Sequence, residues 1–421
     1  MHKNLSKKEI LINKFMEVRK RTNFLAEKLS VEDMNIQSAV FVSPTKWHLA
    51  HTTWFFEQII LKRFSKEYSN NNPTFDYLFN SYYNSIGKQH PRHKRGLISR
   101  PSVNEISEYR KNIDNKIVDL IFKKSSFSKE FSFSLDVAIN HEQQHQELIL
   151  MDIQHVFFSN PQKPAYLPKS SIAKNKNHKD IKTLNFKKFD SVNCIIGSEK
   201  MEFYFDNEGP NFKKKINSFK ISTNTVSNYE WKQFMLDDCY NRSDLWLSDG
   251  FDFIKKNNII KPFYWIDQNH HFTLRGIQKI CDTNPVTNIS FYEADAFARW
   301  KEKRLPTEFE TEYLLKNSVV EGNFQEKNNF EPLSCNDNKI INNLYGNTWE
   351  WTSSHYLPYD SYKPWKKNLS EYNSKFMFNQ LVLKGGSCLT PISHIRASYR
   401  NFFYPEDRWA CNSFRLAESV F

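Results

Sequence analysis

Histidines occur in two clusters whose spacing suits a metal site. His141 and His145 are four residues apart in segment 135–158, which contains neither Gly nor Pro and repeats apolar residues at helical intervals. Both imidazoles should therefore point off one face of a helix. An earlier cluster, His48 with His51, can complete the site. Neutral imidazoles bind both iron and zinc, so the residue types alone leave the metal open.

The earlier cluster needs a helix of its own to position it. Ser43 and Pro44 are typical of a helix N-cap and first turn, and a helix from there to Glu57 would place His51 on a face with two tryptophans. A single histidine on such an aromatic face is more often a core residue than a ligand. The histidine pair of the later helix favours the ligand interpretation, with His48 as the alternative ligand from the first helix.

Metal-bound histidines usually donate their second ring N–H to an acceptor nearby. Three carboxylates close to the clusters are candidates for this role, namely Glu57, Glu142 and Glu147.

Length and composition favour a globular protein of about two domains. The chain has 421 residues with 36 Phe and 10 Trp, enough large apolar side chains for two cores. Its net charge of +12 comes from scattered lysines, so we expect no nucleic-acid partner. The six cysteines stand far apart, the first residues lack an apolar signal core, and no run of about eighteen apolar residues occurs. We therefore expect a cytoplasmic protein without a membrane span.

The character of the chain changes part-way along. We expect a helical bundle over residues 1–165, interrupted by a polar loop at 69–101, and then a linker at 166–182 rich in Lys, Asn and Ser. Residues 183–421 form short pieces separated by turn signals, with one clear helix at 290–303. The whole chain should be an α+β protein.

The polar loop carries two arginines and two tyrosines that suit a substrate site. Arg92 and Arg95 are three residues apart and can clamp a carboxylate. Tyr82 and Tyr83 are adjacent, so in an extended segment one phenol faces inward and one outward, and either can face the metal. A solvated basic loop and hydrogen-bonded core phenols are the alternative interpretations.

Several further motifs occur in an order that is similar to one family. In the first domain they are Trp47-His48-Leu49-Ala50-His51, Asn80-Ser81-Tyr82-Tyr83 and the stretch from His141 to Glu147. In the second they are segments that begin at Asn207, Val226, Pro285, Arg304, Gly346, Lys384 and Arg400. The chain resembles the iron-dependent sulfoxide synthases of ergothioneine biosynthesis, in which a DinB-like four-helix bundle precedes a mixed domain of the C-type-lectin and formylglycine-generating-enzyme kind.

The resemblance implies roles for individual residues. The implied Fe(II) ligands are His51, His141 and His145. The implied substrate contacts are Arg92 and Arg95 for the carboxylate of a thiol, with Gln144 and Trp409 for an imidazole. Tyr82 or Tyr83 would donate a proton near the iron. The implied substrates are cysteine or γ-glutamylcysteine, N-alpha-trimethylhistidine and O2, and the product is a sulfoxide.

Two departures from the family pattern bear on the substrates. Ala410 to Ser413 stands where relatives have a Gln-Phe-x-Gly-like run, and no acidic residue follows Trp409, which favours cysteine over γ-glutamylcysteine. Residues 391–401 lack the two copper-binding cysteines of formylglycine-generating enzymes, so we do not expect that activity. The alternatives are a sister synthase acting on histidine (toward ovothiol) or on a selenium donor (toward selenoneine), a DinB-type metal-dependent thiol transferase, and a noncatalytic binding module.

Overall fold

The computed structural model describes residues 6–70, 72–168, 184–198, 203–334, 340–366 and 369–420. The chain divides into two compact units. The helical unit consists of Met1–Gln162 with Lys367–Glu371, and the mixed unit of Lys163–Lys366 with Tyr372–Phe421.

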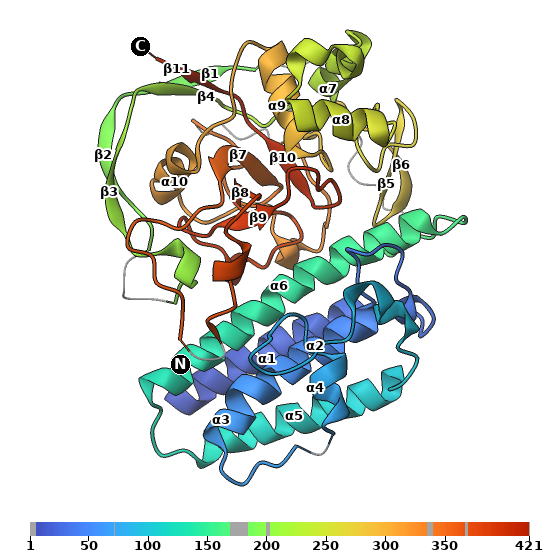
Figure 1. Cartoon of the computed structure of the whole chain (residues 1–421), viewed down its shortest axis with the longest axis vertical. Coiled ribbons are helices and arrows are strands. Elements are labelled where there is room, and N and C mark those ends of the chain that lie inside the picture. The colour runs from blue at the N-terminus through green and yellow to red at the C-terminus, as the bar shows by residue number, and fades with distance from the viewer. Residues whose placement is uncertain are drawn as a thin grey trace, which may run out of the picture. The chain divides into compact units, whose positions relative to one another are not determined.

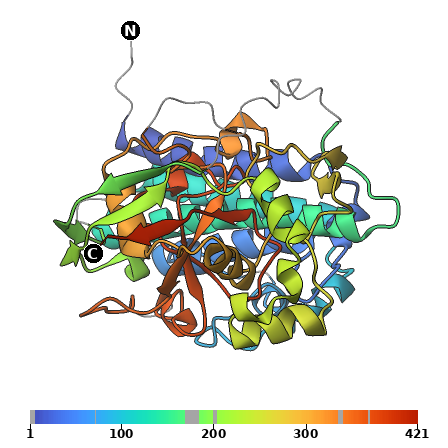
Figure 2. The same cartoon turned by 90° about the horizontal axis from the view of Figure 1, so that it is seen from above.

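Four long helices form the core of the helical unit. The helices of this unit are α1 (Lys7–Ala26), α2 (Thr45–Phe56), α3 (Lys62–Phe64), α4 (Thr74–Leu78), α5 (Val103–Lys123) and α6 (Lys129–Ser159). Helices α1, α2, α5 and α6 pack against one another (Figure 1), and Figure 2 shows the same helices from above. Every residue of α2 is buried, so this helix occupies the centre of the bundle.

Local sequence signals explain where the long helices begin. Ser6 starts α1 and Ser102 starts α5, and each forms a capping box with the glutamate three residues later. Reciprocal side-chain bonds of this kind satisfy backbone N–H groups that have no partner within the helix. Helix α2 begins differently, because its N-cap is Pro44, and Ser43 makes no capping bond to it. The prediction that Ser43 is the N-cap is therefore wrong.

Beyond Phe56 the chain of α2 continues through a π-helical turn at Glu57–Leu61 into α3. A π turn adds a residue to the helical repeat, and such turns often occur beside functional sites. Here it follows the segment that carries His48 and His51.

The mixed unit contains short strands and four helices in its described part. Its strands are β1 (Phe186–Phe189), β2 (Val192–Ile196), β3 (Phe212–Ile216), β4 (Phe219–Ser222), β5 (His270–Thr273), β6 (Gly276–Lys279), β7 (Trp349–His355), β8 (Leu381–Lys384), β9 (Asn401–Phe403), β10 (Asn412–Phe414) and β11 (Ala417–Ser419). The sheet order is β10-β7-β8-β9 in the largest sheet, with β1-β4-β11, β2-β3 and β5-β6 beside it. Strand β10 pairs with β7 in parallel, and the other named pairs are antiparallel.

The helices of the mixed unit are α7 (Asn228–Leu236), α8 (Ser248–Lys256), α9 (Phe291–Trp300) and α10 (Glu308–Lys316). Helix α9 lies within the predicted helix at 290–303, but the prediction of only one clear helix in this part of the chain is wrong. Each of the other three is nine residues long, too short for a helical repeat to stand out in the sequence.

Four arginines of segment 396–415 tie the mixed unit together. Each bonds through Nε to Oε2 of a buried glutamate at 2.7 or 2.8 Å, in the pairs Arg396–Glu208, Arg400–Glu308, Arg408–Glu293 and Arg415–Glu350. A buried ion pair of this kind is costly to break on one side, because the remaining charge is left without compensation. Glu293 also caps α9, so one carboxylate fixes both a helix start and a distant segment.

The prediction of an α+β protein with a helical bundle before a mixed domain is confirmed. Among the described residues, no helix is both long and apolar enough to cross a lipid bilayer.

Candidate metal centre

Three imidazoles converge between α2 and α6 of the helical unit. One ring nitrogen from each of His51, His141 and His145 lies within 4.8 Å of the others. The Nε2 atoms of His51 and His141 are 3.2 Å apart. Two nitrogens that bind the same metal at about 2.1 Å lie roughly 3.0–3.5 Å apart for bond angles near 90–109°. The spacing of these nitrogens therefore fits a shared metal ion.

A backbone carbonyl sets the orientation of His51. Its Nδ1 lies 2.6 Å from the carbonyl oxygen of Phe79, which accepts a hydrogen bond and so places the ring proton on Nδ1. The lone pair of Nε2 then faces the other two histidines. Trp47 stacks on the same ring with centroids 4.6 Å apart and an interplanar angle of 9°, which fixes the ring plane.

A carboxylate acts on His145 through His48. The Nε2 of His48 lies 2.9 Å from Oδ2 of Asp152, and the Nδ1 of His48 lies 2.8 Å from Nδ1 of His145. When the Nε2–H of His48 donates a hydrogen bond to the carboxylate, Nδ1 of His48 can accept a hydrogen bond from the Nδ1–H of His145. His145 is thereby left with its Nε2 lone pair for a metal.

The three converging imidazoles are neutral at neutral pH. Burial lowers the pKa of His51, His141 and His145 well below the usual histidine value, and the neighbouring imidazoles act in the same direction. A histidine must be neutral to bind a metal, so these side chains need lose no proton at pH 7 to act as ligands. The donor set of three neutral, converging nitrogens fits a divalent iron or zinc ion.

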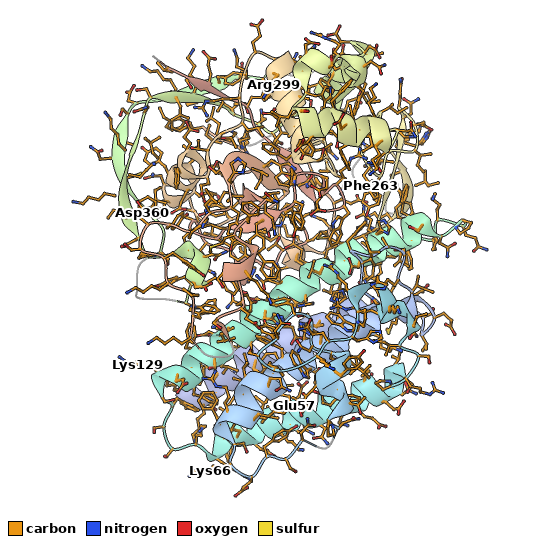
Figure 3. All side chains as sticks on the ribbon, viewed as in Figure 1. Glu57, Lys66, Lys129, Phe263, Arg299 and Asp360 are labelled. Carbon is orange, nitrogen blue, oxygen red and sulfur yellow. The ribbon has the colours of Figure 1, made fainter. Side chains whose placement is uncertain are left out.

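The structure changes the roles expected of the residues around the ligands. His48 hydrogen-bonds to a ligand candidate and lies outside the three-nitrogen cluster. Glu57, labelled within the helical unit in Figure 3, accepts hydrogen bonds from the hydroxyls of Tyr68 and Tyr109. Glu142 binds two arginines. The prediction that Glu57 or Glu142 accepts a hydrogen bond from a liganding histidine is therefore wrong, and the same role for Glu147 stays a prediction.

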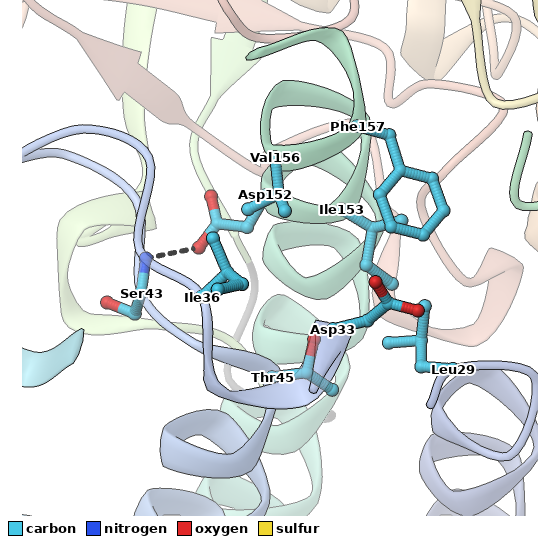
Figure 4. Close-up of a pocket in the computed structure, with 9 residues that line it drawn as sticks. All are labelled: Leu29, Asp33, Ile36, Ser43, Thr45, Asp152, Ile153, Val156 and Phe157. Atoms are coloured by element: carbon cyan, nitrogen blue, oxygen red, sulfur yellow. Dashed lines mark hydrogen bonds between the residues drawn. The ribbon is translucent and has the colours of Figure 1, made fainter. Parts of the chain in front are cut away.

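Asp152 contacts the ligand candidate His145 through His48, and the sequence analysis did not identify it. It lies on α6 seven residues after His145, which is two helical turns along nearly the same face. This spacing is the feature of the sequence that could have indicated that Asp152 lies near the histidines. Its Oδ2 also accepts a hydrogen bond from the Ser43 backbone N at 2.8 Å, as Figure 4 shows. A small pocket lined by Leu29, Asp33, Ile36, Thr45 and other residues borders its carboxylate.

An Asp152→Asn variant should bind Fe(II) or Zn(II) about 10–100-fold more weakly than the unchanged protein, because its amide cannot hold His48 and Ser43 as the carboxylate does. Competition with a coloured chelator measures this affinity. Asp136→Asn is the matched control, since Asp136 lies on the same helix and pairs with a half-exposed lysine, Lys14. Equal affinities in the two variants would show that Asp152 does not support the ligand.

Of the two loop arginines, only Arg95 is buried. Its guanidinium lies 3.4 Å from the centroid of the Trp47 ring, and Nη1 donates to Ser43 Oγ at 2.9 Å. Burial, and then the charge of Arg92, lower the pKa of Arg95 to about 9, so it is still a cation at pH 7. Its Nε has no hydrogen-bond partner among the described residues. This desolvated cation is suited to binding an anionic group.

Arg92 is exposed and donates from Nη2 to the carbonyl oxygen of Phe41. The two arginines therefore do not form a symmetric clamp in this structure. The predicted carboxylate contact fits Arg95 better than Arg92.

The two tyrosines do not face opposite ways as an extended segment would place them, because their side chains lie against each other. Tyr83 is buried and Tyr82 is half-buried, their rings stack at 4.5 Å, and the Tyr83 hydroxyl donates to that of Tyr82 at 3.3 Å. The Tyr83 ring lies 5.7 Å from Phe55, which in turn stacks on His141 at 3.9 Å. One aromatic ring thus connects Tyr83 with a ligand candidate.

The two residues predicted to contact the imidazole substrate lie in different units. Gln144 is a half-buried residue of α6, adjacent to His145 in the sequence. Trp409 is a buried residue of the mixed unit, with its ring 6.2 Å from that of Phe403. Their roles stay predictions.

Both units match models of known protein families. A family model described as "Sulfatase-modifying factor enzyme 1-like domain" matches residues 187–341 and 329–420, which together make up more than half of the chain. A model described as "DinB superfamily" matches residues 14–149.

Three of the curated relatives have names that refer to hercynine or ergothioneine. The hercynine oxygenase of Mycolicibacterium thermoresistibile is 22% identical over 440 residues, which cover 97% of this chain and 95% of that protein. The hercynine oxygenase of Mycolicibacterium smegmatis is 28% identical over 51% of this chain and 56% of that protein. Ergothioneine biosynthesis protein 1 of Schizosaccharomyces pombe is 26% identical over 52% of this chain and 28% of that protein. The match thus spans little more than half of the second relative and less than a third of the last.

These matches confirm the resemblance expected from the motifs, and they agree with the order of the helical and mixed units. The chain therefore belongs to the sulfatase-modifying factor enzyme 1-like domain family, with a DinB superfamily domain in its helical unit.

Proposed function

We propose that the protein is a sulfoxide synthase of the ergothioneine pathway, which uses Fe(II) and O2 to join the sulfur of cysteine to the imidazole carbon of N-alpha-trimethylhistidine. The observation that carries the proposal is the cluster of three neutral, converging histidines in a DinB-type unit. The similarity of the chain to a hercynine oxygenase, over 97% of its length, supports an oxidative reaction on this kind of substrate.

His51, His141 and His145 would hold the iron. When bound, iron supplies activation of O2 and lowers the pKa of a coordinated thiol. Three neutral ligands leave the full positive charge of the ion, which favours an anionic thiolate as a further ligand. Phe79 and the His48–Asp152 pair orient two of the three imidazoles, so the site keeps its geometry without relying on the substrate.

Arg95 would bind the carboxylate of the thiol substrate. Its buried guanidinium stacks on the ring of Trp47, and that ring stacks on the ring of His51. Only Trp47 therefore separates the guanidinium from an implied iron ligand. Charge-assisted hydrogen bonds to a carboxylate are strongest in such a desolvated position. The face of Trp409 would suit the trimethylammonium group, which cannot donate a hydrogen bond.

The two tyrosines would supply a proton during the reaction. The hydrogen bond from Tyr83 to Tyr82 lets the half-buried hydroxyl of Tyr82 pass a proton to or from the buried one. Tyr82→Phe and Tyr83→Phe should change the ratio of sulfoxide to plain thiol oxidation product, which mass spectrometry measures. Unchanged ratios in both variants would remove the tyrosines from the mechanism.

The deciding experiment is anaerobic loading with Fe(II), followed by exposure to O2 with each of four substrate pairs. The pairs combine cysteine or γ-glutamylcysteine with histidine or N-alpha-trimethylhistidine, and products are identified by mass spectrometry. We expect a coupled sulfoxide from cysteine and N-alpha-trimethylhistidine, with O2 uptake that protein loaded with Zn(II) does not show.

Other outcomes point to the alternatives. A coupled product that forms with histidine but not with N-alpha-trimethylhistidine would make the protein a sister synthase. A coupled product that forms only with a selenium donor, tested in parallel, would lead to the same conclusion. Tight Zn(II) binding without O2 uptake for any pair would overturn the proposal in favour of a thiol transferase.

A further inference from the structure

Two buried cysteines of the mixed unit lie in contact although 23 positions separate them in the sequence. The Sγ atoms of Cys388 and Cys411 are 3.7 Å apart. Cys388 is fully buried, while Cys411 keeps 8% of its surface exposed. Neither forms a disulfide in this structure. The pair takes no part in the proposed metal chemistry.

The backbone of Asn347 holds both cysteines in place. The N–H of Cys388 donates to the Asn347 carbonyl oxygen at 3.0 Å, and Sγ of Cys411 lies 3.8 Å from the same oxygen. Trp349, two residues further along, donates its N–H to the carbonyl oxygen of Cys411 at 3.0 Å. The Asn347 side chain is itself bonded to the backbone of Leu333. The contact between the sulfurs is therefore built into the β7–β10 region of the sheet.

We propose that Cys388 and Cys411 form a reversible disulfide when the protein meets a peroxide. A sulfur–sulfur bond is about 2.0 Å long, so the two sulfurs need to approach by less than 2 Å, which side-chain rotation can supply. Because Cys411 is the more exposed of the two residues, its thiol reacts first, giving a sulfenic acid and water from one molecule of hydrogen peroxide. The Cys388 thiol then displaces the hydroxyl as water and closes the disulfide. Two thiols are oxidised, one peroxide is reduced to two waters, and a dithiol reverses the reaction.

The disulfide would tie two loops that approach from different strands. Cys388 lies in a turn closed by the bond from the Thr390 N–H to the Ser387 carbonyl oxygen at 3.0 Å. Cys411 follows Ala410, whose carbonyl oxygen accepts a hydrogen bond from Asn288 at 2.8 Å. The covalent link would close the loop that carries three of the ion-paired arginines of segment 396–415. Its effect on the fold does not depend on the proposed enzymatic function.

Cys239 provides a matched control within the same unit. It is fully buried, like Cys388, but its thiol faces the Asp237 carboxylate. Burial, and then the charge of Asp237, raise the pKa of Cys239 to about 12. A thiol in this environment is a poor nucleophile and should stay reduced.

The test is peroxide oxidation of the folded, full-length protein. Reduced protein is treated with hydrogen peroxide, its remaining thiols are alkylated, and peptides are mapped without reduction by mass spectrometry. We expect a cross-linked peptide pair containing Cys388 and Cys411 that is lighter by two hydrogens and disappears with dithiothreitol. The oxidised protein should melt about 5 °C higher, because closing the loop restricts the unfolded chain.

Variants separate this pairing from general oxidation. Cys239→Ser should keep the cross-link, whereas Cys388→Ser and Cys411→Ser should each lose it. In the Cys388→Ser variant, Cys411 has no partner thiol and should accumulate sulfenic or sulfinic acid. The proposal is wrong if the thiols of Cys388 and Cys411 can still be alkylated while the half-exposed Cys194 is oxidised. It is also wrong if the disulfide forms only after the protein has unfolded. Mapping of the unchanged protein decides the question even where a variant fails to fold.

Discussion

A His141→Ala variant is expected to lose Fe(II) binding and turnover together. The Nε2 of His141 lies 3.2 Å from that of His51, and the nitrogen donors of the three histidines converge within 4.8 Å. Removing a supporting residue typically weakens a metal site by about 10–100-fold, so removing a ligand should cost more than about 100-fold in affinity. Iron content after anaerobic loading and gel filtration, together with product formation, measures both effects.

His93→Ala is the control for this substitution, because His93 is an exposed histidine of the same unit. It should keep full iron content and turnover. His141→Gln preserves most of the side-chain volume and so separates ligand loss from the packing defect left where Phe55 stacks on the ring. A His141 variant that is folded and still binds one iron would show that the ligand assignment is wrong.

The largest effect on stability is expected at Glu142, the residue next to His141 on α6. Its carboxylate is fully buried, receives a 2.8 Å bond from Arg19 and pairs with Arg110 on its other oxygen. Burial alone would raise the pKa of Glu142, but the charges of Arg110 and Arg19 outweigh burial and lower it to about 2. Glu142→Ala would leave two buried guanidinium groups without this anion and should lower the free energy of unfolding by about 3–5 kcal/mol.

Chemical denaturation at pH 7 measures this loss. Glu130→Ala is the matched control, because Glu130 lies on the same helix and forms a half-exposed pair with Arg63. It should cost no more than about 1 kcal/mol. Since the folded-state pKa of Glu142 is below its usual value of 4.5, its contribution is complete above pH 4.5 and is lost as pH falls toward 2. Similar losses for the two alanine variants at pH 7 would show that the buried network does not hold the bundle together.

Spacing along one helix made part of the candidate metal centre predictable. His141 and His145 share a face because of the helical repeat alone, whereas the ligand role of His51 on α2 was implied by the family resemblance. The role of His48 depends on Asp152, which lies 104 positions away in the sequence, and no local pattern reports such a pairing. The partners of Glu57, Tyr68 and Tyr109, likewise come from other segments of the bundle, so no local pattern predicts them.

In the mixed unit, the order of the motifs indicated the family, but it did not predict three of the four helices. Helix α7 and helix α10 each begin with a capping box, Ser227 with Glu230 and Thr307 with Glu310, and these short signals were available in the sequence. A segment of nine residues is too short for a helical repeat to accompany such a capping signal. The buried positions of Arg400 and Arg415 could not be read from composition, because arginine is usually exposed unless it is paired.

The arginine–glutamate pairs of the mixed unit also constrain how this unit can fold during synthesis. The paired residues are 65, 92, 115 and 188 positions apart, and in every pair the arginine comes later. A ribosome therefore releases Glu208, Glu293, Glu308 and Glu350 well before the cations that will neutralise them. Until segment 396–415 emerges, four carboxylates destined for burial must stay in water, so the core of this unit cannot close early. Such long-range pairing predicts slow, late folding of the mixed unit, whereas the helical unit can form its bundle while synthesis continues.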